Sequence, residues 1–243
     1  MNIPVLLYHK IVNDNEKADD NFSISVSTFK NQIEYLKNKN YVTISLNELL
    51  NFLFSKIKLP KKCIIITFDD SYKNILTIAK PILDNVGFKA TVFVVSKSIG
   101  LYNFWDNPDE QRKVPCLDKN ELLSLIKSGW DIGSHSLTHA HLLKITEDKI
   151  IKEIYGSKFD LEQTLKTDIV SFAYPFGEYN NKIREFVIKA GYKLGFSIIS
   201  PALTVTGDPI LIRRILIKKS DSFEDFKRKI SFWYLLYRGV MKK

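Results

Sequence analysis

The sequence has only two cysteines, Cys63 and Cys116, and it has no hydrophobic run long enough to cross a bilayer. Two cysteines, one opening an apolar run and one in a predicted loop, do not form the disulfide framework of a small secreted protein. No basic and apolar leader precedes the first predicted strand, which begins near Ile3. These absences predict a cytoplasmic protein.

Glycine and proline are also scarce, with 10 and 8 residues among 243, and no segment has a repetitive or low-complexity composition. Because 45% of the residues are hydrophobic, the chain can bury a large core. No shift in composition marks a second domain. We therefore predict one domain that spans residues 1–243.

Acidic residues are outnumbered, since 36 Lys and Arg residues against 27 Asp and Glu residues give a net charge of +9. This charge suits an anionic partner, but a solvated, lysine-rich surface explains it at least as well. The sequence has no helix-turn-helix, zinc-finger or single-strand-binding motif, so we expect no nucleic-acid partner.

Short apolar runs rich in β-branched residues alternate with amphipathic helical patterns along the whole chain, which is typical of βα units. Three capping-box patterns predict helix starts, at Ser45–Glu48, Asp118–Glu121 and Asp221–Glu224. The count of about seven βα units favours an α/β barrel over an open sheet. In such barrels the reactive groups gather where strands end and the following loops begin.

Two polar motifs follow predicted strands. The first motif is the pair of adjacent acids Asp69 and Asp70, which could simply cap a helix. However, successive residues at the end of a strand point in different directions, so Asp70 could bind a metal while Asp69 reaches a water beside it. His135 and His139 are four residues apart, which would set both on one face of a helical turn. Together with a carboxylate they offer three ligands and an open position, as in catalytic zinc sites. By the same spacing, His141 would face away from this pair.

The segments TFDD, HSLTH and FAYPFGEYN resemble the successive motifs of the polysaccharide deacetylase family, the metal-dependent carbohydrate esterases that act on N-acetylated sugars. The resemblance extends over about residues 3–217 and implies a single distorted (β/α)7 barrel. The opening VLLYHKI is similar to the branch of bacterial poly-N-acetylglucosamine deacetylases. That branch implies a circular permutation of the common deacetylase strand order.

The resemblance also implies roles for particular residues. Asp70, His135 and His139 match the metal ligands of the family, and Asp69 matches its catalytic base. The backbone N–H of Phe176, in the YPFG loop, matches the donor that holds the oxyanion.

Two departures from the family pattern affect the site. The arginine that usually precedes the proline loop is Ala173 here, and Arg213 or Arg214 could replace it; we favour Arg214, as in the same branch. No histidine follows His141 to serve as the usual general acid, so we expect His9 to take that role. A histidine at a strand end is otherwise most often a core or rim residue.

Aromatic and loop residues complete the predicted site. We expect the substrate to contact Tyr8, Trp105, Tyr174 and Pro175. Trp105 belongs to an irregular segment, 100–118, which we predict to form a loop over the site. A ring that packs on the barrel would explain Trp105 equally well.

Taken together, these features predict a metal-dependent hydrolase that removes N-acetyl groups from an N-acetylated amino sugar or polysaccharide and releases acetate. Zn²⁺ is the favoured metal, with Co²⁺ or Ni²⁺ as alternatives. The alternative substrates are a lipid-linked or nucleotide-linked amino sugar or another small amide, and the alternative to an enzyme is a non-catalytic glycan-binding barrel. The apolar and basic segment 230–243 could lie at the inner face of a membrane, or it could pack as a last helix. The oligomeric state is left open.

Overall fold

The computed structural model describes residues 3–16, 20–106, 109, 112–199 and 207–231. The strands are β1 (Val5–Tyr8), β2 (Lys10–Val12), β3 (Ser23–Ser25), β4 (Val42–Thr43), β5 (Cys63–Phe68), β6 (Thr91–Val94), β7 (Asp131–Ser134), β8 (Ser171–Ala173), β9 (Leu194–Ser197), β10 (Ile212–Arg213) and β11 (Ile215–Leu216). The α-helices are α1 (Val26–Asn38), α2 (Leu46–Ser55), α3 (Lys80–Asn85), α4 (Lys119–Lys127), α5 (Glu147–Leu165), α6 (Asn181–Lys189) and α7 (Phe223–Lys229), and the π-helix η1 (Ile75–Ala79) precedes α3.

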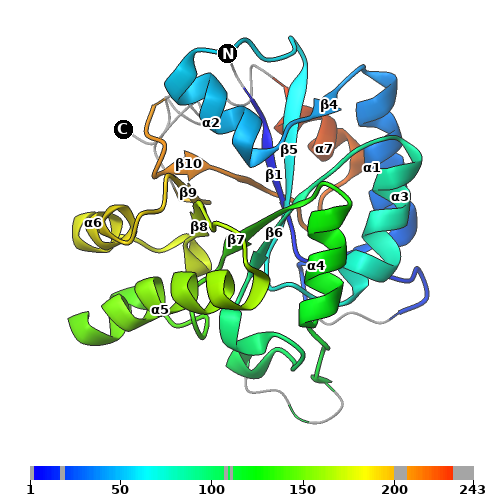
Figure 1. Cartoon of the computed structure of the whole chain (residues 1–243). Coiled ribbons are helices and arrows are strands. Elements are labelled where there is room, and N and C mark those ends of the chain that lie inside the picture. The colour runs from blue at the N-terminus through cyan, green and yellow to red at the C-terminus, as the bar shows by residue number, and fades with distance from the viewer. Residues whose placement is uncertain (1–2, 17–19, 107–108, 110–111, 200–206, 232–243) are drawn as a thin grey trace.

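The main sheet is a nearly closed parallel barrel with helices around its outside (Figure 1). The strand order is β10-β9-β8-β7-β6-β5-β1-β11, with β4 paired to β5. Strands β10 and β11 are separated only by Arg214, so this one segment pairs with β9 on one side and with β1 on the other. The first strand of the chain therefore lies beside the last, and the predicted (β/α)7 barrel is confirmed. Strands β2 and β3 form a separate small sheet.

The period-two alternation of the strands decides which side chains face the inside of the barrel. In β5, Ile64 and Ile66 pack in a buried cluster together with residues of the surrounding helices. Cys63 and Ile65, on the other face of the strand, belong to a second buried cluster. The same alternation carries on past the end of β5 and brings Asp69 to the inner rim. Hydrophobic burial on both faces thus fixes the register that positions the polar residues.

Two of the three predicted capping boxes are confirmed, at Ser45–Glu48 and Asp118–Glu121. The third prediction, Asp221–Glu224, is wrong by one residue, because the box forms between Ser222 and Asp225. The Asp221 carboxylate instead accepts a backbone N–H from the preceding turn.

The segment 230–243, predicted to contact a membrane or to pack as a helix, lies outside the described residues beyond Ser231. Within the described ranges, no helix combines the length and the apolar character that spanning a membrane requires.

Gly195 in β9 is required by the close approach of the segment that precedes β10. A Cβ atom there would lie 2.0 Å from the carbonyl oxygen of Ile210. We predict that Gly195→Ala destabilises the fold by about 1–3 kcal/mol, because backbone atoms must move to admit the methyl group. Gly156→Ala is the matched control. Gly156 lies inside helix α5, and a Cβ atom there would make an ordinary 3.5 Å contact with Leu137. Chemical denaturation measures both, and an equal effect of the two substitutions would contradict the prediction.

Candidate metal and catalytic site

The polar residues predicted from five separate segments meet at one end of the barrel. They line a cavity of about 330 Å³ at the ends of the strands. Among its lining residues are His9, Asp69, Asp70, His135 and His139. Barrel closure therefore brings together polar residues that are up to 205 positions apart in the sequence, counting from His9 to Arg214.

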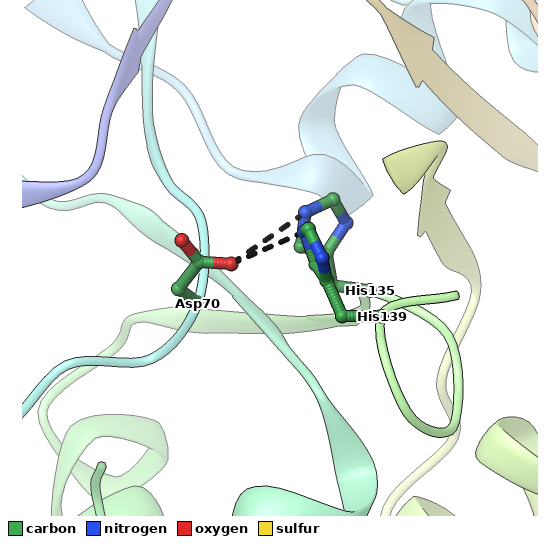
Figure 2. Close-up of side chains that lie close together, drawn as sticks. All are labelled: Asp70, His135 and His139. Atoms are coloured by element: carbon green, nitrogen blue, oxygen red, sulfur yellow. Dashed lines mark ion pairs between the residues drawn. The ribbon is translucent and has the colours of Figure 1, made fainter. Parts of the chain in front are cut away.

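Asp70, His135 and His139 form a buried group whose ligand atoms all lie within 4.8 Å of one another. One carboxylate oxygen of Asp70, Oδ1, faces both imidazoles (Figure 2). It lies 3.8 Å from Nε2 of His135 and 3.5 Å from Nε2 of His139. These separations are too long for hydrogen bonds, but they are close to those between two ligands of one metal ion. Two ligands that each lie ~2.1 Å from a tetrahedral ion are roughly 3.4 Å apart.

The chemistry of these three side chains also fits a cation. Asp70 Oδ1 is buried without a hydrogen-bond partner, which is costly unless another group compensates it. Burial raises the pKa of Asp70, and a cation at this position would stabilise the charged carboxylate. Burial lowers the pKa of His135, and it lowers that of His139 to about 4. Both imidazoles are therefore neutral at neutral pH, as metal ligands must be.

A backbone carbonyl orients the His135 ring. Nδ1 of His135 lies 2.8 Å from the carbonyl oxygen of Ala173. Because a carbonyl can only accept, Nδ1 carries the proton and Nε2 presents its lone pair to the site.

The expected helical turn between the two histidines is not present. Residues 135–141 have no helical hydrogen bonding, and the chain turns through left-handed conformations at Ser136 (φ 65°) and His139 (φ 62°). The prediction was wrong because a spacing of four residues on a tight loop can also bring two side chains together. The rings still face each other, with centroids 4.8 Å apart.

Asp69 is paired with Arg214, which lies at the point where the barrel closes. Two guanidinium nitrogens donate to its two carboxylate oxygens, at 2.6 and 2.7 Å, and both side chains are buried. Burial raises the pKa of Asp69, but the positive charge of Arg214, aided by His135, outweighs burial and holds that pKa at about 2. Asp69 is therefore an ionised carboxylate beside the ligand group, with Oδ2 3.5 Å from Nε2 of His135.

His9 follows β1 and lines the same cavity. Its ring packs against Phe22, with centroids 4.9 Å apart, and burial lowers its pKa. Tyr8, the neighbouring residue, points to the opposite side of the strand, where it is fully buried and donates to Gln32 Oε1 at 2.8 Å. The strand alternation thus turns Tyr8 away from the cavity in which a substrate contact was expected.

The proline loop forms the one-turn 3₁₀ helix η6 (Pro175–Gly177), in which Phe176 adopts a left-handed conformation (φ 58°). Phe176 lines the cavity, and its backbone N–H as the oxyanion donor stays a prediction. His141 is not part of the ligand group. Its ring stacks on Phe176 with centroids 3.6 Å apart, and its Nδ1 lies 3.2 Å from Oε2 of Glu178.

The other expected substrate contacts have mixed positions. Tyr174 lines the cavity, although its hydroxyl donates to the Ile210 carbonyl. Pro175 is buried beside it. Trp105 lies in a 3₁₀ turn, η3 (Phe104–Asp106), where its ring packs 5.2 Å from the ring of His139.

Several cavity residues were not predicted. Phe22 and Asp106 line the cavity, as do Lys10 and Asp20, which form an ion pair. Asp20 and Phe22 lie in an irregular segment and Asp106 lies in the short turn η3, so no periodic pattern marks them. Only the position of Lys10 directly after His9 could have indicated it.

The comparisons agree with this geometry. The family model described as polysaccharide deacetylase matches residues 56–195. A poly-β-1,6-N-acetyl-D-glucosamine N-deacetylase of Staphylococcus aureus strain MSSA476 is 33% identical over 219 residues, which cover 86% of this chain and 72% of that protein.

Solved structures share the fold. The deacetylase PplD of Streptococcus pyogenes, solved in complex with acetate, has a TM-score of 0.79 at 24% identity and matches 95% of this chain and 99% of its own. A de-N-acetylase of Aggregatibacter actinomycetemcomitans has a TM-score of 0.80 at 19% identity, over 95% of this chain and 100% of its own. At these identities the likeness establishes the barrel alone.

The Arg214–Asp69 pair predicts a pH-dependent loss of stability. Arg214→Met leaves a buried carboxylate unpaired, so we expect unfolding free energy to fall by about 3–5 kcal/mol at neutral pH. The folded-state pKa of Asp69, about 2, is below its ordinary value of 3.8. The stabilisation is therefore complete above about pH 4 and is lost as the pH falls towards 2.

Denaturation of both proteins between pH 7 and pH 2 measures this difference, which should shrink as the pH falls below about 4. Arg184→Met is the matched control, because the Arg184–Asp208 pair is partly exposed and should contribute less than about 1 kcal/mol. A loss for Arg214→Met as small as that of the control would contradict the account.

Proposed function

Because the chain belongs to the polysaccharide deacetylase family, we propose that it removes N-acetyl groups from β-1,6-linked poly-N-acetylglucosamine. The chain is a hydrolase of carbon–nitrogen bonds. The observation that carries the proposal is an ionised, arginine-paired Asp69 directly beside the Asp70–His135–His139 group in one cavity. The named activity of the staphylococcal relative supports the choice of glycan.

We propose Zn²⁺ as the metal, since two neutral imidazoles and one carboxylate are the donors of many catalytic zinc sites. Co²⁺ and Ni²⁺ accept the same donors. Bound to Asp70, His135 and His139, the ion would polarise the acetamide carbonyl and make a nearby water more acidic.

Asp69 takes the proton of the attacking water. A carboxylate with a pKa of about 2 is a weak base, so it depends on a water that is already acidified. The Arg214 guanidinium keeps Asp69 ionised and holds both of its oxygens in place. One function of the pair is thus to prevent Asp69 from acquiring a proton before the substrate arrives.

The Phe176 amide N–H donates to the oxygen of the acetamide as negative charge develops there, and one such donor typically contributes ~10²–10³ in rate. The rings of Phe22 and Phe176 are exposed at the cavity. Such faces pack well against the C–H face of a pyranose, which supports a sugar substrate. His9, in its imidazolium form, gives a proton to the departing amine, which is otherwise a poor leaving group. Burial disfavours that form, whereas the neighbouring carboxylates of Asp70 and Asp69 favour it.

The proposed glycan is tested by measuring acetate release from four substrates: β-1,6-linked and β-1,4-linked N-acetylglucosamine tetramers, a nucleotide-linked N-acetyl sugar and a lipid-linked one. We expect the β-1,6 tetramer to react fastest. A preference for another of the four substrates would replace β-1,6-linked poly-N-acetylglucosamine as the proposed glycan. No acetate release from any of them would reject an enzyme in favour of a glycan-binding barrel.

Asp69→Asn should retain the metal and lose nearly all turnover, because an amide cannot accept the proton.

His9→Ala should fold and bind metal normally but should lose ~10²–10⁴-fold in amide hydrolysis, the usual contribution of a positioned acid. The loss should be much smaller on an activated acetate ester, whose leaving group needs no proton. Steady-state rates on both substrates measure the difference. Equal losses on amide and ester, or no loss on either, would show that His9 only packs at the rim and is not the general acid.

A further inference from the structure

The loop that carries His139 is held from one side by the backbone that follows β6. The carbonyl oxygens of Ser136 and Leu137 accept the N–H groups of Ser96, at 3.1 Å, and of Lys97, at 3.0 Å. The N–H groups of the loop are left to bind elsewhere.

Two of those N–H groups bind a single side chain on helix α5, whereas the N–H of His139 donates to Oγ of Ser136 at 3.0 Å. Oε2 of Glu153 accepts the N–H of Leu137 at 3.0 Å and that of Thr138 at 2.9 Å, and Oε1 accepts the Thr138 hydroxyl at 2.5 Å. One turn further along the same helix, Ser157 accepts the hydroxyl of Ser134 at 2.8 Å. This face of α5 therefore holds both ends of the metal-binding motif from behind.

The surroundings of Glu153 show a specific fit. Its side chain is 7% exposed, and no described lysine or arginine forms an ion pair with it. Successive backbone N–H groups next to a left-handed residue form a concave anion site, and Ser136 supplies that conformation here. The Glu153 carboxylate occupies this site, and its hydrogen bonds to described residues all go to the loop.

We propose that Glu153 is a positioning residue that sets where His139 stands relative to Asp70 and His135. The left-handed backbone at Ser136 and His139 is strained for non-glycine residues and persists only where its surroundings determine it. The hydrogen bonds of Glu153 end at Thr138, directly before His139, so they determine the direction in which that ring leaves the backbone. The proposal rests on the metal site of the proposed function.

The test is zinc affinity, measured on metal-free protein by competition with a chelator. Loss of a partner that orients a ligand typically weakens metal binding by 10–100-fold, and we expect this for Glu153→Ala. Glu162→Ala is the matched control: Glu162 also lies on α5 and accepts a backbone N–H, that of Ile169 at 3.0 Å. That loop carries no metal ligand, so zinc affinity should stay within twofold of the wild type.

A second readout is the visible spectrum of the Co²⁺-loaded protein, which should change in Glu153→Ala and stay unchanged in Glu162→Ala. Equal effects of the two substitutions, or none, would overturn the proposal, since Glu153 would then only stabilise the fold. If the alanine variant does not fold, Glu153→Gln decides: its weaker, uncharged bonds should cost at least threefold in affinity, and wild-type affinity would overturn the proposal. A wild type that binds no zinc would instead reject the metal site itself.

Discussion

The buried pair of Arg214 and Asp69 connects the closure of the barrel to the chemistry of its rim. Arg214 is the residue between β10 and β11, where one segment joins β9 to β1. Its two hydrogen bonds to Asp69 are available only when that segment closes the sheet. A buried ion pair typically stabilises a fold no more than two well-packed apolar residues of similar volume would. Its importance is that it leaves Asp69 charged in a buried place.

The neighbouring acid has the opposite environment. Among the described residues no arginine pairs with Asp70 and its Oδ1 has no hydrogen-bond partner, and burial raises its pKa. Two successive carboxylates thus have different environments, which fit the proposed roles of Asp69 as acceptor of a proton from an acidified water and of Asp70 as a cation ligand. The two histidines complete the second role, because burial keeps their rings neutral. The loop contacts around Glu153 hold one of those rings in place.

Much of this site could be predicted from sequence because side chains alternate between the two faces of each strand. The ends of the parallel strands also meet at one end of the barrel. That logic places Asp69, the metal group and His9 together, and it turns one of Arg213 and Arg214 inward. The choice of Arg214 depends on the resemblance to one branch of the family, and Arg214 is the residue that meets Asp69. Tyr8 precedes His9 on the same strand, so the same alternation turns Tyr8 away from the cavity, contrary to the expected substrate contact. The alternation cannot find Phe22, Asp106 or the left-handed turn at Ser136, since irregular loops follow tertiary packing and no periodic pattern. The stacking of His141 on Phe176 joins two such loops and was likewise beyond sequence reasoning.

The central claim is that one divalent ion, held by Asp70, His135 and His139, acts with Asp69 in deacetylation. The most direct measurement is a titration of metal-free protein with Zn²⁺ while acetate release from a β-1,6-linked N-acetylglucosamine oligomer is followed. The account predicts no release without metal and a linear rise that ends at one equivalent per chain. Full activity in the metal-free protein, or a rise that continues to two equivalents, would contradict it.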